Sequence, residues 1–186
     1  MSTRSLANLS SVCIRKDFTI RDYVQEQISR SLHIKLEEMK ERIMPEDIEP
    51  IVQLLESLEI TFHLRPPQID LLVKAFAKSC DEMYIHNISK LYLAVSRVIP
   101  LYLNSDQPAC FQEYELLKHN IVQKLLSVRK DPLSKDVVTL SDVLTLSLPM
   151  SADGISGDSP VWNLFKDIIY SNQSLLTFSD WAMVSR

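Results

Sequence analysis

The chain has 186 residues, of which 46% are hydrophobic and 24% charged, and its formal net charge is −4. That length allows one domain with a buried core, and the net negative charge disfavours a protein that coats nucleic acid by charge alone. The whole chain has two glycines, and because tight β-hairpins and phosphate-binding loops both depend on glycine, the composition favours an all-α protein.

The cysteines and the hydropathy indicate the compartment only broadly. Cys13, Cys80 and Cys110 are far apart and odd in number, which favours reduced thiols over a disulfide framework or a metal knuckle. No run of about 18 apolar residues occurs, so the sequence predicts no membrane span.

Residues 1–16 have the composition of a mitochondrial transit peptide. They contain Arg4, Arg15 and Lys16, several serines and no acidic residue. The same residues also fit an ordinary first helix of the repeat described below, and both interpretations stay open.

Two amphipathic stripes between residues 45 and 83 predict a helical hairpin. The first stripe runs from Ile48 to Leu58 and the second from Ile69 to Phe76, each with apolar residues three and four apart. Pro66 and Pro67 separate them, and consecutive prolines cannot continue a helix.

The first stripe recurs along the chain. Its pattern can be placed at four starts, each with a helix-capping residue type before the first apolar residue: Ser5-Leu6, Asp47-Ile48, Asn87-Ile88 and Asp136-Val137. Pro100 and Pro149 are predicted to end the third and fourth of these helices.

The second stripe recurs as well. Residues 24–32, 72–80 and 164–172 align without gaps, and Tyr114 to Leu125 supply the remaining copy. We therefore predict an all-α, right-handed array (solenoid) of about four helical hairpins at residues 3–40, 45–83, 85–128 and 134–174, with a partial fifth at 177–186. A non-repeating α-bundle is the alternative.

The sequence lacks the motifs of the common catalytic and metal sites. It has no G-x-S-x-G, no G-x-x-x-x-G-K-[ST] and no H-E-x-x-H, and its four histidines are dispersed. We predict that the protein is not an enzyme and takes no cofactor, no metal and no small-molecule substrate.

A set of basic residues follows the repeat on the second helices. Arg30, Lys74, Lys78 and Lys166 are expected on the side away from Phe76 and its equivalents, where they could form a track for RNA phosphates. Tyr92 and Arg97 are candidates to stack on bases. The alternative is the ordinary basic decoration of an exposed helix face.

Large apolar residues are concentrated near the C-terminus. They are candidates to bind a protein partner: Leu176, Phe178, Trp181 and Met183. The alternative is a helix that folds back on its own hairpin.

Three segments carry a resemblance to a known class of repeat. EDIEPIVQLLESLEI, HNISKLYLAVSRVIP and FSDWAMVSR resemble the opening helices of octotricopeptide and heptatricopeptide repeats, which occur with FAST-kinase-like and RAP-domain proteins. The resemblance implies a mitochondrion or plastid and RNA metabolism or the organellar ribosome.

The expected function is a non-catalytic subunit of an organellar assembly linked to RNA. The mitochondrial ribosome is the specific expectation, with other protein subunits and rRNA as partners. The alternative is a protein-binding scaffold of HEAT or armadillo type in the cytosol, without RNA contact.

Overall fold

The computed structural model describes residues 4, 5, 8, 21–38, 42–56, 66–100, 108–130, 136–177 and 180. Within these residues the protein is all-α: it has seven α-helices and two 3₁₀ turns, and no strand occurs. None of the helices among them is both long enough and apolar enough to cross a bilayer.

Each of the three ranges from residue 45 onward contains two of the described helices. Range 45–83 holds α3 and α5, range 85–128 holds α6 and most of α8, and range 134–174 holds α9 and α10. Their bounds are α2 (Arg21–Glu38), α3 (Pro45–Glu56), α5 (Pro66–Ser79), η1 (Cys80–Glu82), α6 (Ile85–Val98), α8 (Pro108–Lys130), α9 (Leu140–Ala152), α10 (Pro160–Ser171) and η2 (Gln173–Leu175). Residues 1–16 lie almost entirely outside the described residues.

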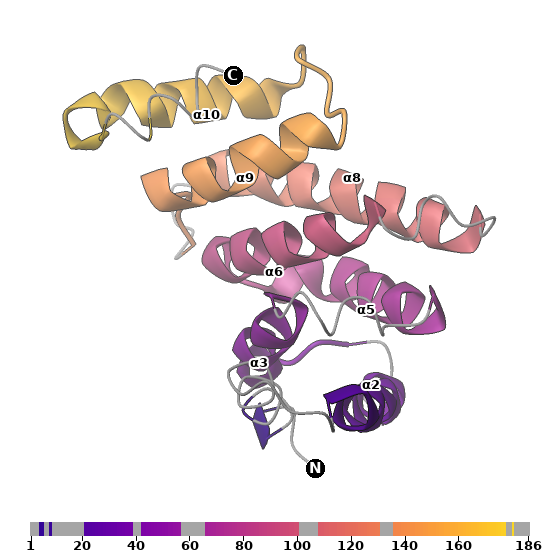
Figure 1. Ribbon diagram of the computed structural model, residues 1–186. Helices are drawn as coiled ribbons and strands as arrows, with labels where there is room; N and C mark the ends of the chain where they lie inside the picture. The colour runs from indigo at the N-terminus through magenta and orange to yellow at the C-terminus, as the bar shows by residue number, and fades with distance from the viewer. Residues whose placement is uncertain are drawn as a thin grey trace.

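The helices pack in two rows. In the first row α3 packs on α6 and α6 on α9; in the second row α2 packs on α5, α5 on α8, and α8 on α10, which also contacts α9. Figure 1 shows this order rising from α2 and α3 to α10.

The apolar stripes form the core between these rows. The fourth and seventh residues of the three first-row helices are all at most 2% exposed: Ile48, Ile51, Ile88, Leu91, Val143 and Leu146. A helix turns once in 3.6 residues, so positions four and seven share one face, and that face is buried in each helix. In the second row, Phe76 of α5 is 0% exposed.

The predicted register of the fourth first-row helix is wrong by six residues, and its start by three. Val137 is 65% exposed and precedes the helix, which begins at Leu140. The residue equivalent to Asp47 and Asn87 is Asp142, and all three are the third residue of their helix, not its N-cap. Apolar spacing alone did not fix the register because several offsets place leucines on one face.

The prediction that Pro149 ends its helix is also wrong. Pro149 lies inside α9, which continues to Ala152. Proline lacks an N–H but keeps its carbonyl, and the Pro149 carbonyl accepts the N–H of Asp153 at 2.9 Å. In the last turn of a helix, the carbonyls are the groups that lack an intrahelical partner. The missing N–H of Pro149 therefore does not end α9.

Candidate functional site

The four cations predicted to contact RNA lie on three helices of the second row. Arg30 is on α2, Lys74 and Lys78 are on α5, and Lys166 is on α10. Acidic side chains share this row: the Arg30 guanidinium pairs with Glu26 at 2.6 Å, and Asp167 pairs with Arg129 at 2.6 Å. The row therefore presents charges of both signs.

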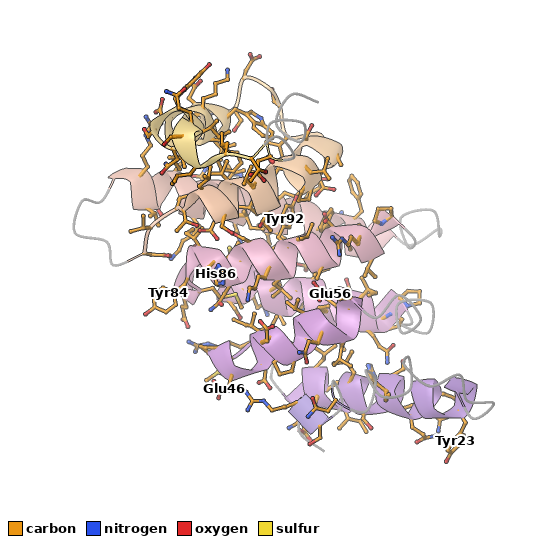
Figure 2. The ribbon with its side chains drawn as sticks, turned by 60° about the vertical axis from the view of Figure 1, so that its left-hand side comes forward. Tyr23, Glu46, Glu56, Tyr84, His86 and Tyr92 are labelled. Atoms are coloured by element: carbon orange, nitrogen blue, oxygen red, sulfur yellow. The ribbon has the colours of Figure 1, made fainter. Side chains whose placement is uncertain are left out.

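The prediction that Tyr92 stacks on RNA bases is wrong. Tyr92 is 0% exposed, so its ring is inaccessible to a base. Figure 2 shows Tyr92 within the stack of helices, whereas Tyr84 and His86 lie at its edge, where α6 begins. Arg97, the other candidate, is exposed in the last turn of α6.

The predicted partner-binding residues are described only in part. Leu176 is partly buried and packs against the core of its own chain. Phe178, Trp181 and Met183 lie outside the described residues.

Asp153 joins three helices at the end of α9. Its carboxylate accepts the hydroxyl of Tyr92 from α6 and, at 2.6 Å, the hydroxyl of Tyr114 from α8. Burial raises the pKa of both phenols above the ordinary value, and the nearby Asp153 carboxylate adds to the increase. The two hydroxyls therefore remain donors over the whole physiological pH range.

A glycine positions this carboxylate. Gly154 has φ +73°, the left-handed conformation that ends many helices, and its N–H donates to the Ser151 carbonyl at 3.1 Å. The Ile155 N–H donates to the Met150 carbonyl at 3.1 Å, and Ile155 packs on the core. These two bonds form a Schellman motif, which leaves Asp153 as the C-cap facing α6 and α8.

A surface hollow of about 230 Å³ lies between α8 and this turn. Lys118 lines it, but its ammonium is already bound to Glu115 at 2.6 Å and to the Asp153 carbonyl at 3.1 Å. Its charge is therefore neutralised within the protein. The other polar side chains that line the hollow are Glu115, Asp153 and the exposed His119.

Asp142 makes a second set of polar contacts between helices, at the start of α9; such a set is called a joint below. Thr139 and Asp142 form a capping box: the Asp142 N–H donates to Thr139 Oγ1 at 3.2 Å, and the Thr139 N–H donates to Asp142 Oδ2 at 3.0 Å. The other carboxylate oxygen accepts Ser89 Oγ from α6 at 3.1 Å, with His86 Nδ1 at 3.5 Å. Asp142 is 1% exposed.

This serine, histidine and aspartate do not form a catalytic triad. In a triad the serine donates to the histidine, but the single hydroxyl proton of Ser89 is shared between the Asp142 carboxylate and the Ile85 carbonyl. Ser89 is also 1% exposed, so no substrate reaches it. The cluster is a bridge between α6 and α9.

The third joint connects α5, α6 and α8. Asp136 accepts the N–H of Ile85, at 3.0 and 3.1 Å to its two oxygens, and so caps α6 from a distant part of the chain. From α8, Asn120 donates to the Ala77 carbonyl at 3.0 Å and Lys124 to the Asp81 carbonyl at 2.7 Å. Free groups at helix ends are thus satisfied by neighbouring helices.

These joints were not predicted from the sequence, although one signal was present. Thr139 to Val143 read TLSDV, and Thr177 to Trp181 read TFSDW. A threonine followed three residues later by an aspartate fits a capping box and gives the register that apolar spacing did not. Nothing local identifies Tyr114 or Asp153.

Among the residues that the structure describes, no group of three or more His, Cys, Asp and Glu side chains could hold a metal ion. Comparisons with protein-family models, with curated proteins and with solved structures each found no match to this chain.

Proposed function

We propose that the protein is a non-catalytic helical-repeat subunit, a right-handed solenoid of hairpins that binds other proteins and one RNA segment within an organellar assembly. The mitochondrial ribosome is the assembly we propose. The observation that carries the proposal is the packing of equivalent helices side by side in two rows. Such rows create long surfaces suited to extended partners.

The hydrogen bonds at the joints favour a role as a rigid scaffold. Asp142 links α6 to α9, and Asp153 links the end of α9 to α6 and α8. A buried polar group that loses its partner costs about 1 to 3 kcal/mol, so sliding one helix along another is opposed at both ends of α9. A surface held in this way keeps its partners in a fixed relation.

RNA contact is proposed through Arg30, Lys74, Lys78 and Lys166, with Arg97 on the other row. The first four lie on second-row helices, and Arg97 lies on α6, which contacts α8 of that row. The organellar setting is proposed from the resemblance of the first-row helices to octotricopeptide and heptatricopeptide repeats.

A cytosolic protein-binding scaffold without RNA contact is the second candidate. The observation that favours it is the acidic component of the second row, where Glu26 pairs with Arg30 and Asp167 with Arg129. A phosphate that approached either cation would be repelled by the carboxylate paired with it.

Cell fractionation separates the two candidates. The full-length chain, carrying an epitope tag, is isolated from organelle and cytosolic fractions and sedimented with and without RNase. We expect the tagged protein in the organelle fraction, where it should sediment with a large particle that RNase disperses. A cytosolic complex that is insensitive to RNase would contradict the organellar RNA proposal and support the scaffold.

Direct RNA binding is tested with two triple variants of equal charge. One variant neutralises three of the proposed contacts, Lys74→Gln, Lys78→Gln and Lys166→Gln. The other neutralises cations that form ion pairs with Glu38, Glu49 and Asp167, namely Lys35→Gln, Lys90→Gln and Arg129→Gln. Loss of three phosphate contacts reduces the slope of log K against log salt by about 2 for single-stranded RNA. We expect that reduction in the first variant and not in the second; equal slopes would contradict the proposed track.

A further inference from the structure

Asp153 is followed by Gly154, and in an unfolded chain this dipeptide is chemically labile. The sequence has glycine after an aspartate or asparagine at this one place. Because glycine has no Cβ, its backbone nitrogen can come close to the side chain of the preceding residue. From there it can attack the carboxyl carbon of an aspartic acid, which is the first step of aspartate isomerisation.

The reaction releases and takes up water and needs no other reactant. The Gly154 nitrogen bonds to Cγ of Asp153, loses its proton and displaces one carboxyl oxygen as water, so that a cyclic imide forms. Water then adds to either imide carbonyl. Breaking the bond from nitrogen to Cγ returns aspartate, whereas breaking the bond from nitrogen to the main-chain carbonyl carbon gives isoaspartate, whose backbone runs through Cβ and Cγ.

In the folded protein the peptide group between the two residues is held at both ends. Its carbonyl accepts the ammonium of Lys118 from α8 at 3.1 Å. Its N–H donates to the Ser151 carbonyl of α9 at 3.1 Å. Asp153 has ψ 4°, so along the Cα–C bond the Gly154 nitrogen nearly eclipses the Asp153 nitrogen and lies away from Cβ. The peptide group must therefore turn, and break both hydrogen bonds, before the ring can close.

The carboxyl group under attack is held as well. It accepts the hydroxyl of Tyr92 from α6 and, at 2.6 Å, that of Tyr114 from α8. The two residues are 0% and 2% exposed, so the packing of their helices fixes these donors in place. Both reacting groups, the nitrogen and the carboxyl carbon, are thus immobilised while the end of α9 is closed.

We propose that Asp153–Gly154 is a latent isomerisation site, which the hydrogen bonds from α6 and α8 keep unreactive. When the end of α9 opens, isomerisation releases it from both helices. Isoaspartate adds Cβ to the backbone between α9 and α10 and moves the free carboxylate onto Cα, so the Schellman motif and the bonds to the tyrosines no longer form together. The release persists, because closing the helix end does not restore aspartate. This inference does not depend on the proposed function.

Ageing of the full-length protein over several weeks tests the proposal. The chain is kept at neutral pH in buffer and in 6 M guanidinium and then digested, and the isoaspartate at position 153 is quantified by chromatography with mass spectrometry. We expect its formation to be at least about tenfold slower in buffer, because the end of α9 must open before the ring closes. Equal rates in the two solvents, or no isoaspartate at this position in guanidinium, would overturn the proposal.

Two variants each remove one restraint. Tyr114→Phe deletes a hydroxyl that binds the carboxylate, and Lys118→Met deletes the ammonium that binds the Asp153 carbonyl. Each should form isoaspartate about fivefold faster than the wild type in buffer, since a lost hydrogen bond favours opening. In guanidinium both should match the wild type, because the restraints exist only in the folded chain. An unchanged rate in buffer for either variant would contradict the proposal.

Lys124→Met is the matched control. Lys124 donates to the Asp81 carbonyl at 2.7 Å, as Lys118 donates to the Asp153 carbonyl, and the two lysine side chains are 16% and 14% exposed. This bond lies between α8 and the end of α5, so its loss should leave isomerisation at Asp153 at the wild-type rate. Equal acceleration by Lys124→Met would mean that isomerisation follows general destabilisation, and would overturn local control at the end of α9.

The isomerised protein gives a second readout. After separation from the aged wild type by ion-exchange chromatography, it should unfold about 5 °C below the unmodified chain, because the contacts of Asp153 with α6 and α8 are lost. An unchanged melting temperature would show that the end of α9 stays attached, and would overturn the proposed release.

Discussion

Cys80 shows how burial controls the chemistry of a single side chain. It is 0% exposed, and burial, with a smaller contribution from Asp81, raises its pKa to about 12. The thiolate is the reactive form of cysteine, and at pH 8 about one thiol in ten thousand is ionised at that pKa. Cys80 is therefore expected to be inert in the native protein.

The reactivity of Cys80 is measured in a Cys13→Ser, Cys110→Ser background, so that one thiol remains. With a chromogenic disulfide reagent at pH 8, we expect at least a hundredfold slower reaction in buffer than in 6 M guanidinium, because opening must precede attack. Comparable rates in the two solvents would show that the thiol is accessible in the native state.

Phe76 is the largest side chain at the centre of α5, and it is 0% exposed. Phe76→Ala is expected to lower the free energy of unfolding by about 3 to 5 kcal/mol, because it loses apolar burial and leaves a cavity. Phe111→Ala on α8, where the ring is 50% exposed, should change it by about 0.5 kcal/mol. Urea unfolding followed by circular dichroism gives both values; equal losses would argue against Phe76 as a core residue.

At the scale of single elements, the end of α9 depends on the left-handed residue Gly154. A Cβ added there meets no atom within 4 Å, so the cost of Gly154→Ala is conformational and not steric. We expect about 1 kcal/mol of destabilisation from the positive φ.

The other glycine of the chain provides a matched control for Gly154→Ala. Gly157 also has open space around its Cα and does not adopt the left-handed conformation, so Gly157→Ala should be neutral or slightly stabilising. Thermal unfolding of the two variants should therefore separate them by several degrees. Identical melting temperatures would rule out the Schellman geometry as the feature that stabilises this helix end.

The elements show which parts of the structure the sequence could predict. Apolar spacing predicted α3, α5, α6, α8 and α10 because each buries one stripe, and a stripe is a local property of the sequence. It misplaced the start of α9, where Val137 satisfies the spacing but remains in solvent. Capping fixes a register more tightly than apolar spacing does, since a carboxylate reaches one particular N–H.

The contacts at the joints were beyond prediction for a different reason. Tyr92 and Asp153 are 61 residues apart, and Ile85 and Asp136 are 51 apart. Neither pair has a sequence spacing that implies contact, so Tyr92 appeared to be a surface aromatic residue. Only the packing of α6 against α9 brings its hydroxyl to a carboxylate.

At the scale of the whole molecule, the polar joints occur where helices of successive pairs meet. Lys124 connects the second pair to the third, and Asp136, Asp142 and Asp153 connect the third to the fourth. Each joint gives a hydrogen-bond partner to backbone or hydroxyl groups that would otherwise be buried without one. The rows are therefore stabilised by apolar packing along the helices and by hydrogen bonds at their ends.

This arrangement predicts a steep loss of stability at alkaline pH. The pKa values of Tyr92 and Tyr114 are raised in the folded protein, mainly by burial. Below about pH 10 both phenols are protonated in the folded and the unfolded state, and their contribution to stability is complete. Above that pH they ionise only in the unfolded chain, so the free energy of unfolding falls by about 1.4 kcal/mol per pH unit for each phenol.

Urea unfolding between pH 10 and 11 tests the assignment. Tyr92→Phe with Tyr114→Phe should make the pH slope shallower by about 2 kcal/mol per unit over this range, although the variant is less stable at neutral pH because Asp153 loses two donors. A matched double variant at the exposed Tyr84 and Tyr170 should keep the wild-type slope, because those rings are in water in both states. An unchanged slope in the first variant would mean that the buried phenols do not control alkaline unfolding, and that the joint at Asp153 opens before they ionise.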